Sequence, residues 1–114
     1  MPATLPKEER LSGKTAISAL VADGRWGGCQ HLKYCWKAGN EDSLNRMMVS
    51  VPKKNFKRAV KRNLLKRRIR EAYRTQKDLL AAQGVHIMFV YSSPEIATYE
   101  EIRAEVAKIL TSIK

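Results

Sequence analysis

The 114-residue sequence is short of negative charge and has no long hydrophobic run. It carries 11 Asp and Glu against 22 Lys and Arg, a formal net charge of +11, while 44% of its residues are hydrophobic. No apolar stretch approaches the length of a membrane span, and the polar N-terminus is unlike a secretory signal. The hydrophobic content suffices for one core. We therefore expect a single cytoplasmic domain over residues 1–114 with an anionic partner.

Cysteine and histidine are also scarce, with two residues of each. Cys29, His31 and Cys35 offer three metal ligands, whereas a structural zinc site takes four. In the cytoplasm both cysteines are expected to be reduced thiols. The sequence holds no histidine pair at the spacing of a general acid and base, and no acidic cluster suited to two metal ions. It therefore predicts neither a catalytic centre nor a metal site on the protein.

The positive charge is concentrated in residues 53–74. This segment holds eleven bases and one acid, Glu71, for a net charge of +10, while the other 92 residues net only +1. A solvated helix normally mixes the two signs, because like charges four residues apart destabilise it. The imbalance therefore favours binding to a polyanion.

Apolar spacing and turn residues predict the order helix, strand, strand, helix, strand, helix. The fold class is α+β, an α/β sandwich in which helices pack on a small sheet. The expected elements begin with a helix over 12–23 capped by Ser12 and ended by Gly24, a strand over 31–37 whose side chains alternate between two faces, and a hairpin partner over 46–51. A basic helix with Asn55 as N-cap then runs to at least Arg74 or as far as Gln83, and a buried strand covers 85–91. The last helix is opened by a capping box of Thr98 and Glu101 and carries a core-facing apolar stripe of Ile102, Val106, Ile109, Leu110 and Ile113.

The basic helix has one arc committed to the core, formed by Leu65, Ile69, Ala72 and Tyr73. A membrane-surface helix needs a broader apolar face, and a helix-turn-helix needs a second helix close by in sequence. An RNA backbone fits better. Asn63 is an unfavourable helix residue in the middle of the basic surface, which suggests a specific hydrogen bond there.

Residues 59–74, AVKRNLLKRRIREAYR, closely resemble the signature helix of the bacterial ribonuclease P protein component. The preceding SVPKK resembles that family's strand end and double lysine, and Arg10, Leu11 and the helix ending at Gly24 resemble its N-terminal region. The resemblance implies the fold of the second domain of a small-subunit ribosomal protein. That fold has a mixed sheet, the order α-β-β(-β)-α-β-α, and a left-handed β-α-β crossover through the basic helix.

The resemblance also implies a function. Members of the family join a catalytic RNA, and together they remove the 5′ leader of precursor tRNA. The RNA performs the hydrolysis with Mg²⁺ held mainly by RNA and substrate, and the protein alone is not expected to cleave. No membrane and no obligate protein partner are implied. The alternatives are a non-enzymatic RNA-binding protein of ribosomal or chaperone-like type and, more remotely, a protein-only nuclease.

Carried over by position, the RNA-binding residues implied by the resemblance are Lys53, Lys54, Lys57, Arg58, Lys61, Arg62, Asn63, Lys66, Arg67, Arg70 and Arg74. The implied leader-binding cleft comprises Ile17 and Val21 on the first helix, with Tyr34 or Trp36 on the following strand. Leu64 stands where the family commonly has a second arginine, and Ile17 and Val21 stand where many members have aromatics. We therefore expect a leader contact that is weaker or shifted toward the sheet.

Overall fold

The computed structural model describes residues 9–11, 13–39 and 44–113. In chain order the elements are α1 (Lys14–Asp23), β1 (Arg25–Gly28), β2 (Leu32–Lys37), β3 (Arg46–Ser50), α2 (Ala59–Gln76), the short 3-10 helix η2 (Lys77–Leu79), β4 (His86–Tyr91) and α3 (Tyr99–Ser112). The predicted α+β class and element order are confirmed, with β1 as a further strand. None of the helices in this described part of the chain is long and apolar enough to cross a membrane.

The four strands form one mixed sheet in the order β1-β2-β4-β3. β2 pairs antiparallel with both β1 and β4, whereas β3 pairs parallel with β4. The predicted hairpin between residues 31–37 and 46–51 is therefore wrong, because β4 lies between these two strands. The parallel pair β3 and β4 is joined through α2, so the basic helix is a β-α-β crossover.

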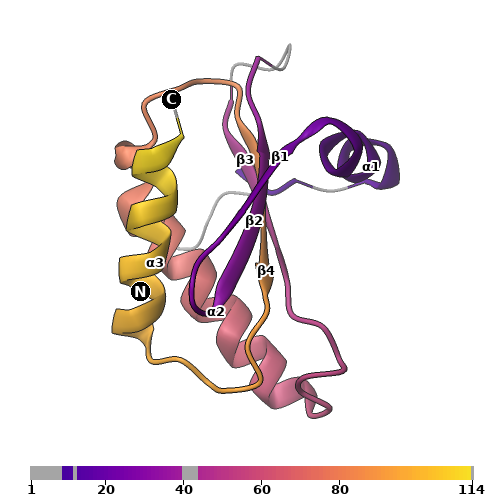
Figure 1. Ribbon diagram of the computed structural model, residues 1–114, viewed down its shortest axis with the longest axis vertical. Helices are drawn as coiled ribbons and strands as arrows, with labels where there is room; N and C mark the ends of the chain where they lie inside the picture. The colour runs from indigo at the N-terminus through magenta and orange to yellow at the C-terminus, as the bar shows by residue number, and fades with distance from the viewer. Residues whose placement is uncertain (1–8, 12, 40–43, 114) are drawn as a thin grey trace.

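The two faces of the sheet are covered unequally. In Figure 1, α2 and α3 pack side by side on one face, while α1 lies on the other face near one end of the strands. The larger core lies under α2 and α3, where Leu65, Ile69 and Tyr73 of α2 are completely buried. A smaller cluster lies under α1 and comprises Leu11, Leu20, Cys35 and Met88. Part of the α1 side of the sheet thus has no helix over it.

The alternation of β2 decides which side chains meet which helix. Leu32, Tyr34 and Trp36 pack against the α2 and α3 core, and Cys35 packs against α1. This confirms the predicted two-residue periodicity, since successive side chains of a strand point to opposite faces.

Helix α1 is fixed against β2 by a close approach at its C-terminal end. The predicted cap Ser12 lies outside the described residues, and Gly13, with φ 94°, is the N-cap before the first helical residue, Lys14. The backbone N–H of Gly24 donates to the Leu20 carbonyl at 2.7 Å. A Cβ on Gly24 would lie 2.4 Å from the Cys35 Sγ. The predicted end of the helix at Gly24 is confirmed, and only glycine allows this contact without a shift.

Helix α2 begins later than the cap preference of Asn55 predicts. Asn55 belongs to a turn in which its N–H donates to the Pro52 carbonyl, and Phe56 is buried in the core. Arg58 is the N-cap and provides no side-chain cap. The helix ends at Gln76, whose side-chain amide donates to the carbonyls of Ala72 and Arg103. The predicted extension to Gln83 is therefore wrong, because the chain leaves the α-helical conformation and forms the 3-10 helix η2.

The C-terminal helix forms as predicted. The Thr98 hydroxyl accepts from the Glu101 N–H at 3.2 Å, and the Glu101 carboxylate accepts from the Thr98 N–H at 3.1 Å. This is a complete capping box. The predicted apolar stripe is buried against α2 and the sheet, and it comprises Ile102, Val106, Ile109, Leu110 and Ile113.

Candidate nucleic-acid interface

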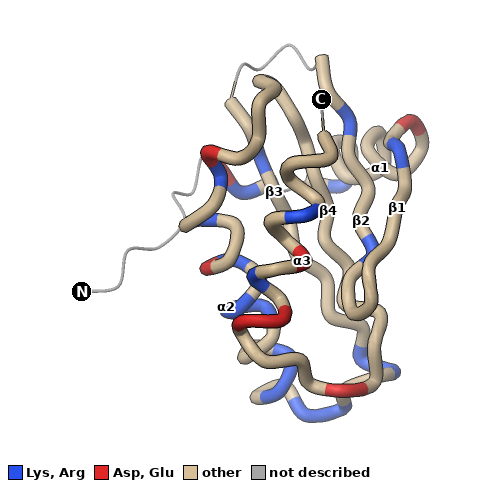
Figure 2. Tube along the Cα trace, turned by 60° about the vertical axis from the view of Figure 1, so that its left-hand side comes forward, with Lys and Arg blue, Asp and Glu red and all other residues tan. Residues whose placement is uncertain are grey.

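The outer surface of α2 and the loop before it carries the concentrated positive charge. Figure 2 shows Lys and Arg gathered along this helix and loop, whereas the sheet and α3 are mostly uncharged with scattered charges of both signs. The exposed members of the predicted RNA-binding set are Lys53, Lys54, Lys57, Arg58, Lys61, Asn63 and Arg67, and the half-buried members are Arg62, Lys66, Arg70 and Arg74. The whole set lies on α2 and the loop before it, and we call it the basic surface.

Three arginines of α2 have partners within the fold. One guanidinium nitrogen of Arg62 donates to the carbonyls of Phe56 and Lys57 at 2.7 and 2.8 Å. Arg68 donates to the Ala97 carbonyl at 2.6 Å, which ties α2 to the segment before α3. Arg74 donates through Nε to the Glu71 carboxylate at 3.0 Å, and this bond lowers the pKa of Glu71. These side chains have structural contacts before any RNA is present.

The remaining side chains of the basic surface are available. Within the described residues, side-chain hydrogen bonds and ion pairs are absent from eight members of this surface: Lys53, Lys54, Lys57, Arg58, Lys61, Asn63, Lys66 and Arg67. A cluster of like charges without counter-charges repels itself, and a polyanion relieves that repulsion.

Arg70 extends the basic surface toward the N-terminal segment. Burial lowers the pKa of Arg70, and the positive charge of Arg10 lowers it further. Arg10 pairs with Met47 in an isolated parallel bridge, and the Leu11 N–H donates to the Met47 carbonyl at 2.7 Å. Positive charge therefore continues from α2 around the β3 edge of the sheet toward α1.

The α1 side of the sheet offers a second surface. The strand register places Trp26, Cys35, Met88 and Met48 in one row on this side, with Gly28, Lys33, Val90 and Ser50 in the next. Helix α1 covers the first row at Cys35, whose Sγ lies 3.4 Å from the Leu20 carbonyl. We call the part beside α1 the open face. It is lined by the exposed side chains of Trp26 and Lys33 and by the half-buried side chains of Met48, Ser50 and Val90.

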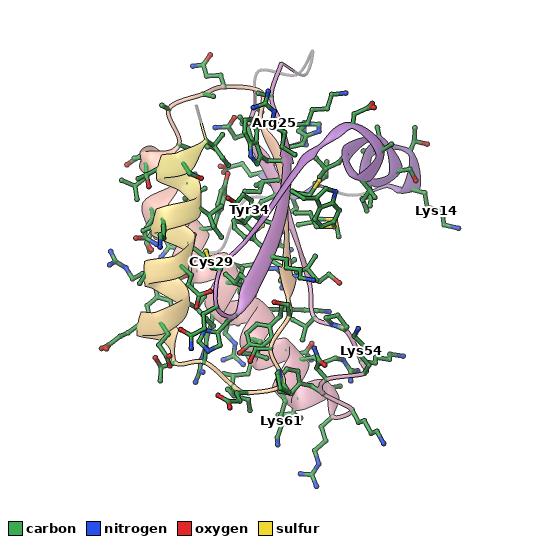
Figure 3. The ribbon with its side chains drawn as sticks, in the orientation of Figure 1. Lys14, Arg25, Cys29, Tyr34, Lys54 and Lys61 are labelled. Atoms are coloured by element: carbon green, nitrogen blue, oxygen red, sulfur yellow. The ribbon has the colours of Figure 1, made fainter. Side chains whose placement is uncertain are left out.

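The two flanks of α1 face in different directions. Thr15, Ala16 and Ala19 line a hollow of about 350 Å³ with Lys37 and His86, at the end of the sheet away from the second row. At 100° per residue, Ile17 and Val21 occupy the opposite flank, beside the open face. Lys14 extends from the start of α1 and Lys54 from the loop before α2, both on the α1 side of the sheet (Figure 3). Ile17 and Val21, the two residues of this helix predicted to bind the leader, thus border the open face.

Tyr34 and Trp36 do not share a cleft with Ile17 and Val21. Both lie on the other side of β2, and Figure 3 shows Tyr34 directed toward α3. The Arg25 guanidinium lies 5.7 Å from the centre of the Trp36 ring. The predicted four-residue cleft is therefore wrong. Successive side chains of β2 point to opposite faces of the sheet, and Tyr34 and Trp36 are on the face away from α1.

Trp26 is one of the residues of this surface that sequence reasoning missed. Its strand is only four residues long and contains two glycines, so it has no readable alternation. Lys33, Met48 and Val90 were missed for a different reason, because their common face depends on β4 pairing between β2 and β3. The signal that could have indicated Trp26 is a tryptophan among glycines directly after a helix.

The cysteines and His31 have separate environments. Burial raises the pKa of Cys35, and burial together with the charge of Glu105 raises the pKa of Cys29. The His31 Nδ1 lies 2.6 Å from the Glu105 carboxylate, which also accepts from the backbone N–H of His31 at 2.8 Å. Across the described ranges, no group of three or more His, Cys, Asp or Glu side chains is arranged to hold a metal ion.

A mixed sheet with a strongly cationic crossover helix and a partly open face beside it defines a small α+β RNA-binding protein. The family described as Ribonuclease P matches residues 5–114. The chain belongs to this family, and it is a protein subunit of ribonuclease P, which processes tRNA.

Curated relatives agree with this assignment, and solved structures share the fold. The chain is 35% identical to the ribonuclease P protein component of Porphyromonas gingivalis, over 98% of this chain and 89% of the relative. It is 34% identical to that of Chlorobaculum tepidum, over 96% and 82%. Its fold is similar to the RNase P proteins of Thermotoga maritima (TM-score 0.81, 22% identity, 93% and 98% of the two chains) and Staphylococcus aureus (TM-score 0.79, 23% identity, 91% and 94%).

Proposed function

We propose that this subunit binds the catalytic RNA of ribonuclease P through the basic surface and the 5′ leader of precursor tRNA on the open face. The observation that carries the proposal is the set of cations on α2 and its preceding loop whose side chains have no partner among the described residues. A protein that only needed a stable helix would place acidic residues among them. Phosphates of an RNA provide the missing counter-charges.

We assign the hydrolytic step to the RNA partner, with Mg²⁺ held mainly by RNA and substrate. The acidic side chains near the surfaces described above are engaged locally: Glu9 with Lys77, Asp23 with Lys37, Glu71 with Arg74, and Glu105 with His31. They are spread over different elements, whereas a two-metal site gathers carboxylates about two ions roughly 4 Å apart. The role of this chain is then to bind and position RNA, in the cytoplasm where precursor tRNA is processed.

The leader assignment rests on the position of the open face relative to the basic surface. Arg10 and Arg70 link the two around the β3 edge. A substrate held by RNA on α2 can therefore extend its single-stranded 5′ end past this edge onto Lys33 and the flank of α1. Apolar side chains with flanking cations suit a single strand, because its unpaired bases can pack on the apolar groups while the cations contact its phosphates.

Reconstituted cleavage tests the proposal. The cognate RNA with this protein should remove the leader at a lower Mg²⁺ concentration than the RNA alone, and the protein alone should cut nothing. Equal cleavage with and without protein would refute the assigned role. A non-enzymatic RNA-binding protein would instead bind unrelated structured RNAs as tightly as the cognate RNA and leave leader removal unchanged.

A further inference from the structure

Trp26 is the most exposed aromatic side chain on the open face. It is 53% exposed, although indole is among the largest apolar groups available for burial. Its cross-strand partner is Cys35, which is buried under α1. Trp26 therefore stands on the α1 side of the outer strand, at the border of the part that α1 covers.

The fold itself leaves the Trp26 ring largely free. The neighbouring residues Gly27 and Gly28 have no side chains to cover it, and the nearby α1 flank presents Val21, itself 43% exposed. The second tryptophan is a contrast, because Trp36 packs at the core edge with the Arg25 guanidinium over its ring.

The surroundings of Trp26 favour nucleic acid over a purely apolar partner. Lys33 is exposed and lies on the same side of β2, one row further along. Such diagonal neighbours across antiparallel strands are about 7–8 Å apart, which is comparable to the distance between a base and a phosphate of the same strand. Bases inside a duplex are already stacked, so only an unpaired base can present its flat surface to this ring.

We propose that Trp26 is the stacking platform for an unpaired leader nucleotide, with Lys33 contacting an adjacent phosphate. This inference rests on the proposed function, which places the leader on the open face. Stacking accepts any base, since each has a flat π surface. Purines should be favoured modestly because they overlap the indole more extensively.

Fluorescence of the holoenzyme provides the test, because the chain has only two tryptophans. Trp36→Phe leaves Trp26 as the only indole. The protein, assembled with its RNA, is titrated with precursor tRNA that carries a non-hydrolysable linkage at the cleavage site, and with mature tRNA without a leader. The precursor should quench Trp26 and mature tRNA should not. A leader with one abasic position at the contacted nucleotide should bind without quenching.

Affinity of variants gives the second readout. Trp26→Leu should weaken precursor binding about 5- to 150-fold, the range expected for loss of one base–aromatic stack, and leave mature tRNA binding unchanged. Trp26→Phe should restore most of the affinity, and Trp36→Phe is the matched control. If the leader strengthens binding but neither quenching nor a Trp26→Leu effect is seen, the stacking inference is wrong and the proposed function stands. If the leader adds no affinity, leader binding on the open face is wrong as well.

Discussion

Single side chains of α2 divide between those that hold the fold and those that remain available to RNA. Arg62 belongs to the first group through its two carbonyl contacts, whereas Lys61 and Asn63 beside it are exposed and have no partner in the described structure. The resemblance assigns all of them to RNA binding. The structure adds that Arg62 orders the loop that carries Lys57 and the double lysine, so part of its effect on RNA is indirect.

Replacing Arg62 by Ala should therefore cost stability as well as affinity. Loss of hydrogen bonds from a charged donor at this half-exposed position should lower the free energy of unfolding by about 1–2 kcal/mol. Urea denaturation followed by circular dichroism measures this. Lys61→Ala is the control and should change stability by no more than about 0.5 kcal/mol, while also weakening RNA binding. If both variants unfold alike, the Arg62 contacts do not stabilise the loop.

At the scale of elements, helix ends and strand pairings show what local sequence could and could not predict. The Thr98 capping box and the buried stripe of α3 follow from local chemistry, and both were predicted correctly. The Asn55 cap was not, because burial of Phe56 and the Arg62 contacts hold that loop in a turn. The hairpin failed because β4, distant in sequence, pairs between β2 and β3.

The cap of α3 makes a prediction with a pH dependence. Thr98→Ala should lower the free energy of unfolding by about 1 kcal/mol near neutral pH. Hydrogen bonds from the backbone and side chain of Thr98 lower the pKa of Glu101. A lowered folded-state pKa stabilises the protein above the unfolded-state pKa, and this contribution is lost as pH falls through the folded value. The penalty of Thr98→Ala should therefore be larger at neutral pH than in acid.

Thermal unfolding of wild type, Thr98→Ala and Thr98→Ser, measured from neutral pH down into acid, shows how the penalty of each substitution depends on pH. Thr98→Ser keeps the hydroxyl and should behave as wild type. A penalty that is the same at all pH values would show that the ionised Glu101 carboxylate does not take part in the cap.

The exposed lysines at the N-terminal end of α2 make a prediction about salt. Each phosphate contact contributes about 0.7–0.9 to the slope of log K against log salt concentration. Replacing Lys57 and Lys61 together by Gln should reduce the slope for the cognate RNA by nearly two such contributions. Lys108→Gln, an exposed lysine on α3, should leave the slope unchanged. An equal reduction by Lys108→Gln would mean that charge acts diffusely and not through the basic surface.

At the scale of the whole molecule, the net charge of +11 is a local property of one β-α-β crossover and its preceding loop. The sequence alone located this charge and the inward-facing arc of α2, because both depend on helical periodicity. It could not locate the open face, since that surface is assembled from β1, β2, β3 and β4 through their register. Tyr34 and Trp36 were assigned to the cleft through the family resemblance, and the strand register places them on the opposite face of the sheet.

The most direct test of the account is single-turnover cleavage of precursor tRNA by the cognate RNA at low Mg²⁺. The comparison is between wild-type protein, a variant with Lys57, Lys61, Lys66 and Arg67 replaced by Gln, and no protein. We predict that wild type accelerates cleavage, while the variant gives a rate close to that of RNA alone with an unchanged melting temperature, because removing like charges does not weaken the core. Equal acceleration by wild type and the variant would contradict the claim that the basic surface binds the catalytic RNA.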